Sequence, residues 1–492
     1  MLYIGIDLGT SAVKLLLMDE KGVIRKIVSR DYPIIFPRPG WSEQNPEDWL
    51  RETFEGIRDL TAFCDKDAIA GIGCCGQMHG LVILDENDKV IRPAILWNDG
   101  RTAIETDYLN SFIGKVRLSE CTANIAFAGF TAPKLLWLKK HEPENFAKIR
   151  KIMLPKDYIN YMLTGKFCTD VSDASGTLLF DVRNKCWSSE MAELCEVRAE
   201  QLPRICESFE QIGKLSASAA NALGLSESVV VCAGAGDNAA AAVGTGTVGN
   251  ARCNISLGTS GTVFISNKEF QVDPQNALHA FAHADGNFHL MGCMLSAASC
   301  NKWWQESILE TTQYKAEEDR ITEDMLGRNR VFFLPYLMGE RSPINDVNAR
   351  GTFIGMSMDA TRADMTLAML EGVAFGIRGS MEVAEQLGIK PRHSKICGGG
   401  AKSALWRRIF ANVLNMDIDT VETEEGPGYG GAILAAVACG EWNSVEEAAN
   451  ELVTIKDTVH PTPETTELYE QRYKQFKQIY PAVKELFPKI NF

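Results

Sequence analysis

The segment YIGIDLGTSAVKLLLMDEKG, residues 3–22, places one acid, Asp7, at the end of an apolar run and follows it with Gly-Thr-Ser. Two apolar runs joined by a short glycine turn predict a β-hairpin. The pattern returns in NISLGTSGTVFIS, residues 254–266, about half the chain further on. Self-similarity at this spacing predicts two related domains, which we place at residues 1–248 and 249–492.

The residues around each hairpin extend the repeat. A third strand-like run follows each hairpin, at residues 22–34 and 287–295, and helices and further strands come later. In the first half, Asn45 and Pro46 predict the N-cap and first residue of a helix. In the second half, apolar spacing predicts alternating helices and strands at 362–388, 394–400, 403–415, 417–422 and 428–440. The alternation predicts an α/β fold.

The two Leu-Gly-Thr-Ser turns are candidate phosphate sites. Glycine lets successive backbone N–H groups aim at one point, and the hydroxyls of Thr and Ser add donors. We expect two such turns, facing each other across a cleft, to hold a polyphosphate. Only the first turn follows an acid, because Ser256 takes the place of Asp7 in the second. A carboxylate beside phosphate needs a cation, so Asp7 predicts Mg²⁺ held through water; the alternative is an aspartate that caps its own turn.

A second acid, Asp237, lies between an apolar strand and an alanine-rich helix in VVVCAGAGDNAAAAVG, residues 229–244. The glycines there match a dinucleotide fingerprint only formally, because no acid follows about 20 residues later, and the chain lacks a Walker A loop. An ionised aspartate at this position could accept the proton of a phosphoryl acceptor. It could also cap the helix, and the two roles are compatible.

Composition excludes several other classes of protein. The chain is 45% hydrophobic and 23% charged, with a net charge of -14 and no basic block for nucleic acid. It has no secretory signal and no run of about 18 uncharged apolar residues for a membrane span, so we expect a cytoplasmic protein. The 14 cysteines are scattered and predict free thiols. His279, His283 and His289 lack a fourth ligand for a metal.

Two long segments, GFTAPKLLWLKKH at 129–141 and GTFIGMSMDATRADMTLAMLE at 351–371, resemble the two signatures of the FGGY carbohydrate kinases. The resemblance covers nearly the whole chain. It implies two ribonuclease-H-like domains of the actin, hexokinase and Hsp70 type around a cleft. Shorter segments are most similar to the xylulokinases of the family: GQMHG at 76–80, RPAILWNDGR at 92–101, LPKDY at 154–158, GDNAAAAVG at 236–244 and LSAASC at 295–300.

The resemblance also implies roles for individual residues. Asp237 matches the catalytic base, and Asp7 matches the acid that serves the Mg-nucleotide. The positions that match sugar contacts, or lie in the same segments, are Gln77, Met78, His79, Trp97, Arg101 and Asn238. Those expected to contact the nucleotide are Thr10, Ser11, Lys14, Gly258, Thr259, Ser260, Gly399, Gly400 and Ala401. For His79, an ordinary buried histidine is the alternative.

The implied reaction is transfer of the γ-phosphoryl group of ATP, with Mg²⁺, to the C5 hydroxyl of D-xylulose. One alternative is a kinase for another ketose or polyol, such as ribulose or glycerol, because a few pocket side chains decide stereochemistry. A second is a non-catalytic nucleotide-dependent protein like actin or Hsp70. The apolar stripe in the C-terminal segment, 463–487, predicts a helix that packs on the body or forms a homodimer contact.

Overall fold

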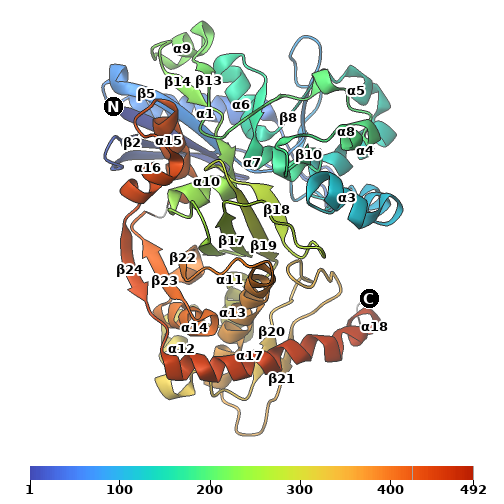
Figure 1. Ribbon diagram of the computed structural model, residues 1–492, viewed down its shortest axis with the longest axis vertical. Helices are drawn as coiled ribbons and strands as arrows, with labels where there is room; N and C mark the ends of the chain where they lie inside the picture. The colour runs from blue at the N-terminus through green and yellow to red at the C-terminus, as the bar shows by residue number, and fades with distance from the viewer. Residues whose placement is uncertain (424, 491–492) are drawn as a thin grey trace. The chain divides into compact units, whose positions relative to one another are not determined.

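Both predicted hairpins are present. β1 (Leu2–Leu8) pairs antiparallel with β2 (Ala12–Asp19), and β16 (Arg252–Leu257) pairs antiparallel with β17 (Gly261–Asn267). These elements come from a computed structural model that describes residues 1–423 and 425–490 (Figure 1). The repeat seen in the sequence is therefore a repeat of structure.

Each hairpin lies inside a seven-stranded sheet, and the two sheets share the order of their central strands. In each, the third strand of the repeat lies beside the second, and a later parallel strand lies beside the first. This order confirms the predicted doubled α/β fold. The first sheet runs β13 (Gln211–Lys214), β14 (Val230–Cys232), β5 (Ile69–Gly76), β1, β2 and β3 (Ile24–Asp31), with β15 (Ala235–Gly236) also on β5. The second runs β18 (His279–Ala282), β19 (Phe288–Met294), β17, β16, β22 (His393–Cys397), β23 (Asp417–Val421) and β24 (Ile455–Val459).

The chain packs into two compact units whose segments are not contiguous in sequence. Unit 1 holds residues 1–249, 280–289 and 425–453. Unit 2 holds residues 250–279, 290–423 and the described residues from 454 onward. Unit 1 thus includes the predicted helix at 428–440, observed as α15 (Gly426–Ala438), although this helix lies late in the sequence.

Glycines bring α15 very close to the first sheet. A Cβ atom on Gly5 of β1 would lie 1.8 Å from the carbonyl oxygen of Gly428, and one on Gly73 of β5 would lie 2.0 Å from that of Gly431. α10 (Asp237–Gly244) contacts the same helix, with a Cβ on Gly244 placed 2.0 Å from the oxygen of Gly426. One helix, α15, therefore fixes three elements: β1, which carries Asp7; β5, which leads to Gln77; and α10, which begins with Asp237.

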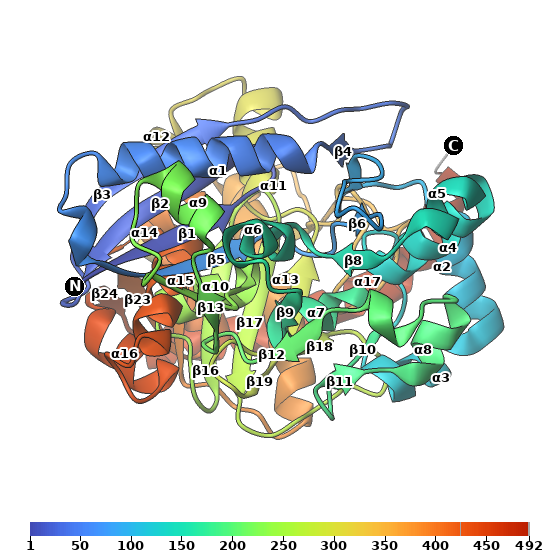
Figure 2. The ribbon, with the colours of Figure 1, turned by 90° about the horizontal axis from the view of Figure 1, so that it is seen from above.

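The other face of the first sheet is covered by α1 (Pro46–Thr61), which lies along β2 and β3 (Figure 2). The helix begins at Pro46 as predicted, but the Asn45 side chain makes no capping hydrogen bond. Trp49, Ile57 and Leu60 are completely buried in the core beneath it. Burial of these large side chains anchors the sheet from the side opposite α15.

Three long helices belong to unit 2: α13 (Arg362–Gln386), α14 (Ala404–Leu414) and α17 (Pro463–Val483). α17 contains the apolar stripe predicted from the sequence. Tyr473 and Phe476 are buried, and their rings lie 5.8 and 5.1 Å from the ring of Phe375 on α13. The expectation that this stripe packs on the body is confirmed for these residues.

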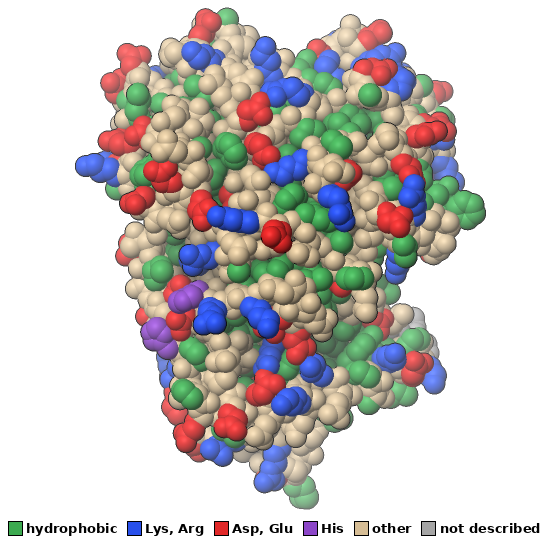
Figure 3. Space-filling model, in the orientation of Figure 1, with side chains coloured by type: hydrophobic (Ala, Val, Ile, Leu, Met, Phe, Trp, Pro, Cys, Tyr) green, Lys and Arg blue, Asp and Glu red, His purple; other side chains and the backbone are tan. Residues whose placement is uncertain are grey.

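The surface carries mixed charge. On the face seen in Figure 3, acidic and basic side chains are interspersed rather than gathered by sign. None of the helices in the described part of the chain combines the length and apolarity that crossing a membrane requires.

We predict that Gly73→Ala destabilises the protein by at least about 3 kcal/mol, because its methyl group would collide with the α15 backbone. Gly213→Ala is the matched control in the same sheet, since the nearest atom to its Cβ would be Lys166 Cγ, at an ordinary contact distance of 3.4 Å. We expect a change below about 1 kcal/mol. Urea unfolding followed by circular dichroism measures both. Equal stability of the two variants would contradict the tight packing.

Candidate functional site

Three parallel strands of unit 1 end at one edge of the sheet. Register pairs Leu8 of β1 with Gly76 of β5, and Gly76 with Gly236 of β15. Residues that follow the carboxyl ends of neighbouring parallel strands gather at one edge, where α/β proteins bind ligands. The structure therefore brings together five of the predicted site residues from distant parts of the sequence: Asp7, Met78, His79, Asp237 and Asn238.

Asp7 lies on β1 directly opposite Lys14 on β2. Burial raises the pKa of Asp7 most, the nearby carboxylate of Asp237 adds to this shift and Lys14 opposes it, so that the pKa lies at about 7. Lys14 also forms a 3.0 Å ion pair with Glu425, a partner that the sequence did not reveal. A second carboxylate nearby disfavours the ionised form of a partly buried acid, so a cation beside the two is stabilised.

Asp237 is the first residue of α10, and Gly236 is its N-cap, so Asp237 is not the capping residue. Its Oδ1 accepts hydrogen bonds from the backbone N–H of Asn238 at 2.7 Å and from the Asn238 side-chain amide at 2.9 Å. Burial raises the pKa of Asp237 and these two hydrogen bonds oppose the shift, so that the pKa lies at about 6. The carboxylate is thus mainly ionised at neutral pH and able to accept a proton.

His79 is held in an unusual backbone conformation, with φ of 68°. Its Nδ1–H donates to the carbonyl oxygen of Gly176 at 2.7 Å, and its ring stacks on Phe130 at 4.6 Å. Gly176 has to be glycine, because a Cβ there would lie 2.4 Å from the imidazole ring. His79 therefore has the well-packed partners of an ordinary buried histidine, and they also fix its ring beside Met78.

The first Gly-Thr-Ser turn is held by side chains. Trp97 Nε1 donates to Thr10 Oγ1 at 2.9 Å, and Gln44 Nε2 donates to the Thr10 carbonyl at 2.6 Å. Gln77 in turn donates to Gln44 Oε1 at 2.9 Å. Ser11 is exposed on the same turn. Gln44 was not predicted from the sequence; a polar residue just before the helix at Pro46 was its only signal.

Arg101 is held by partners within its own unit. Its side chain is completely buried, forms hydrogen bonds of 2.8 and 2.7 Å with Asp99 and pairs with Glu43. Its guanidinium also stacks on Trp41, 3.9 Å from the ring centre. These contacts hold the loop that carries Trp97, which is 44% exposed.

In unit 2, the second Gly-Thr-Ser turn joins β16 to β17. Backbone N–H groups of Ala297 and Ala298 donate to the carbonyls of Thr259 and Gly258 at 3.0 and 2.9 Å, and Thr259 and Ser260 are exposed. The short helix Gly399–Lys402 follows β22, which is the parallel neighbour of β16. The predicted residues Gly258, Thr259, Ser260, Gly399, Gly400 and Ala401 thus lie at one edge of the second sheet.

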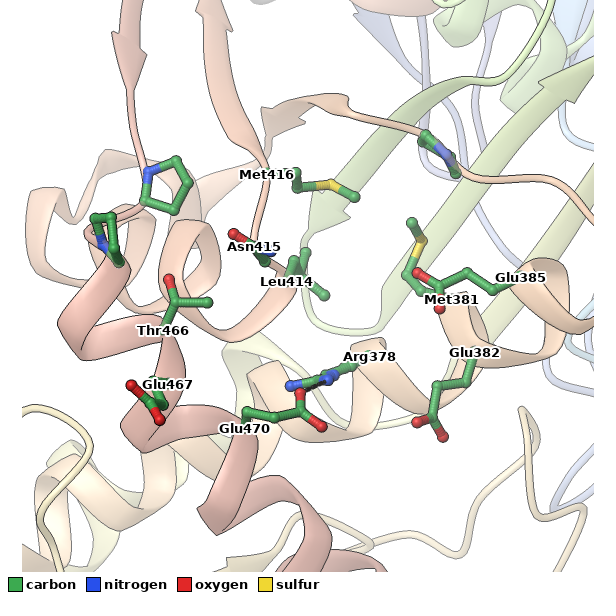
Figure 4. A pocket seen from close by; sticks show the side chains of 13 residues that line it. Arg378, Met381, Glu382, Glu385, Leu414, Asn415, Met416, Thr466, Glu467 and Glu470 are labelled. Atoms are coloured by element: carbon green, nitrogen blue, oxygen red, sulfur yellow. Dashed lines mark hydrogen bonds and ion pairs between the residues drawn. The ribbon is translucent and has the colours of Figure 1, made fainter.

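A separate cavity of about 560 Å³ lies among α13, α17 and the end of α14 in unit 2 (Figure 4). Leu414, Met416 and Met381 line it, and Arg378 at its side pairs with Glu470. None of the predicted site residues is among its lining residues. Of its charged groups, Arg378 pairs with Glu470, and Glu382 pairs with Lys477, which does not line the cavity.

The three histidines noted in the sequence do not form a metal site. His283 Nε2 contacts the carbonyl of Thr247 at 3.0 Å, and its Nδ1 accepts from Ala284 N–H at 2.8 Å. Among the residues described here, no group of three or more His, Cys, Asp or Glu side chains is arranged to hold a metal ion. A metal held by a single carboxylate and water, as predicted for Asp7, does not need such a group.

Comparison with known proteins gives matches over nearly the whole chain. The N-terminal domain of the FGGY family of carbohydrate kinases matches residues 2–244, and the C-terminal domain matches residues 253–439. The chain is 38% identical to the xylulose kinase of Escherichia coli strain K12, over 97% of this chain and 98% of that protein.

Solved structures give the same result. A xyloylose kinase from Brucella ovis superimposes with a TM-score of 0.94 at 38% identity, covering 99% of this chain and 100% of that one. A gluconate kinase from Lactobacillus acidophilus also gives a TM-score of 0.94, at 27% identity, covering 100% of this chain and 99% of that one.

Proposed function

The chain belongs to the FGGY family of carbohydrate kinases, and from this premise we propose that it transfers the γ-phosphoryl group of ATP to the C5 hydroxyl of D-xylulose. The xylulose kinase of Escherichia coli supports this substrate, because the similarity extends over almost the full length of both proteins. The observation that carries the proposal is the position of Asp237 and Asn238 beside Met78, at the strand edge that also holds Asp7.

In the proposed reaction Asp237 accepts the proton of the attacking hydroxyl as the new phosphorus–oxygen bond forms and ADP leaves. Phosphoryl transfer depends mainly on positioning and on neutralising charge, so an ionised, fixed carboxylate is sufficient as the base. Asn238 holds that carboxylate through two hydrogen bonds to its Oδ1. Met78, His79, Gln77 and Trp97 are the proposed sugar contacts, and we assign Arg101 to support of the loop.

Asp7 is the proposed residue for Mg²⁺. Its pKa is raised to about 7 by burial and by Asp237, so a cation beside it would favour the ionised form. Mg²⁺ keeps several waters and binds one or two carboxylates, which suits a site with one such acid. When bound, the ion would neutralise negative charge on phosphate oxygens. The proposed nucleotide contacts are Thr10, Ser11 and Lys14 in unit 1, and Gly258, Thr259, Ser260, Gly399, Gly400 and Ala401 in unit 2.

A kinase for another sugar or sugar acid is the second candidate. The gluconate kinase of Lactobacillus acidophilus has the same TM-score as the xyloylose kinase of Brucella ovis, although its identity is lower. A shared fold does not determine which hydroxyl compound enters the pocket.

We predict that ADP release across a panel of pentuloses, hexuloses, gluconate and polyols is fastest with D-xylulose. A site that hydrogen-bonds the hydroxyls of its substrate discriminates strongly against analogues that lack them. Omitting Mg²⁺ should abolish turnover with every compound. A higher kcat/KM for gluconate or glycerol than for D-xylulose would contradict the proposed substrate, and full activity in a chelator would contradict the need for the ion.

Asp237→Asn should abolish sugar phosphorylation while ATP still binds, because an amide keeps the shape of the side chain but cannot accept the proton. We expect a loss of at least about 100-fold in kcat. Turnover is measured by coupled ADP detection, and ATP binding by calorimetry. Near-normal turnover in this variant would show that Asp237 is not the base.

At saturating Mg²⁺, which favours the ionised form of Asp7, the activity should fall in acid with a midpoint near pH 6. The base must be ionised, and burial raises the pKa of Asp237 to about 6, so the active form is lost as the pH falls through that value. The pH profile of kcat/KM for the sugar measures this. Asn238→Ala removes a hydrogen bond that lowers the pKa of Asp237, so it should move the midpoint to higher pH. An unchanged midpoint in this variant would show that another group, such as ATP itself, causes the pH dependence.

A further inference from the structure

A cluster of buried charged side chains is linked by hydrogen bonds to Gly236, the residue before α10. This cluster has no part in the reaction proposed above. Lys156 Nζ lies 2.6 Å from Asp157, 2.9 Å from Asp170 and 3.6 Å from Asp173. At most 1% of each of these four side chains is exposed. Burying ionised groups is costly, and replacing such clusters by apolar residues is often neutral or stabilising. Stabilisation of the fold alone therefore does not explain why these four charged groups are buried together.

Asp170 connects Lys156 to Ser172. It is the last residue of β9 (Cys168–Asp170) and the N-cap of the short helix α7 (Val171–Ala174). Its Oδ2 accepts hydrogen bonds from the backbone N–H of Ser172 at 2.8 Å and from Ser172 Oγ at 2.5 Å. The same oxygen accepts from Ser208 Oγ at 2.6 Å. Because the Ser172 hydroxyl donates its proton to Asp170, its lone pairs are available to an N–H donor.

That donor is the backbone N–H of Gly236, which lies 3.1 Å from Ser172 Oγ. Gly236 immediately precedes Asp237 and is the N-cap of α10. A side chain at this glycine is excluded, because a Cβ would lie 2.9 Å from Met78 Cγ. The hydrogen bond to Ser172 therefore fixes the peptide group next to Asp237, the proposed base.

Asp173, the remaining acid of the cluster, lies farthest from Lys156, at 3.6 Å. Burial raises the pKa of Asp173 well above its ordinary value, Lys156 opposes this shift, and Asp157, Asp170 and Asp237 add to it. Neither oxygen of Asp173 has a hydrogen-bond partner among the described residues. Asp157 and Asp170 contact Lys156 most closely.

We propose that Ser172 is a positioning residue for Asp237, and that Lys156 and Asp170 orient its hydroxyl to accept the Gly236 N–H. The proposal rests on the proposed function, since it takes Asp237 as the base. Misplacement of a reacting group by about 1 Å can cost about 100-fold in rate. A small displacement of Asp237 would therefore lower kcat without changing how ATP binds.

Ser172→Ala tests the proposal, with Ser208→Ala as its matched control. Each variant removes one hydroxyl donor from the same oxygen of Asp170, but only Ser172 contacts Gly236. We expect Ser172→Ala to lower kcat for the preferred sugar about tenfold or more, with the KM for ATP unchanged. Ser208→Ala should keep kcat within about twofold. Equal kcat values in the two variants would overturn the proposal.

A second pair of variants separates the hydroxyl from the packing. Ser172→Thr keeps the hydroxyl and Ser172→Val replaces it with a methyl group of similar size, so any effect of added volume is common to both. We expect the Thr variant to be about tenfold faster than the Val variant, and equal rates would contradict a role for the hydroxyl. Failure of the proposed function gives a different result, because the unaltered protein would then phosphorylate none of the sugars or Asp237→Asn would remain active.

Discussion

The close approach of α15 to β1, β5 and α10 is the constraint on which the site depends. The backbones are in direct contact there, so a Cβ at Gly5, Gly73 or Gly244 would have no room. These contacts set where the ends of β1 and β5 and the start of α10 lie relative to one another. Asp7 and Asp237 can therefore interact across the edge of the sheet, although 230 positions separate them in the sequence. An interaction between two acids persists only in a framework stiff enough to hold them against their repulsion.

The two acids differ because their surroundings differ. Both have pKa values raised by burial, but Asn238 supplies two hydrogen bonds that favour the ionised form of Asp237. Asp7 has instead the charge of Lys14 across the hairpin and the repulsion of Asp237. Pairs of titratable groups whose environments separate their pKa values commonly take different roles in one reaction. This supports a proton-accepting role for Asp237 and a cation-binding role for Asp7.

Local pattern was sufficient to predict much of the fold. The hairpins, the helix beginning at Pro46 and the helix over Arg362–Gln386 follow from periodicity and capping within short windows. Asp7 and Asp237 stood out because their neighbours are apolar or small. Gln44, Gly176 and the pairing of Glu425 with Lys14 could not be predicted, because each depends on contact between segments far apart in the sequence. The contacts of Arg101 with Trp41 and Glu43 could not be predicted for the same reason.

The two copies of the turn are held by different parts of the chain, and the copy in unit 1 lies beside the turn that carries the proposed base. The turn in unit 2 is held by the backbone N–H groups of Ala297 and Ala298 and by the Ser299 hydroxyl, which donates to the Thr259 carbonyl at 2.7 Å. The turn in unit 1 is held by the side chains of Trp97 and Gln44, and the turn that carries Asp237 is held by Ser172. Backbone hydrogen bonds are sufficient to present N–H donors to a phosphate. A proton acceptor needs a more exact position, because catalysis is sensitive to small displacements of the reacting group, and side chains buried on several elements can provide it.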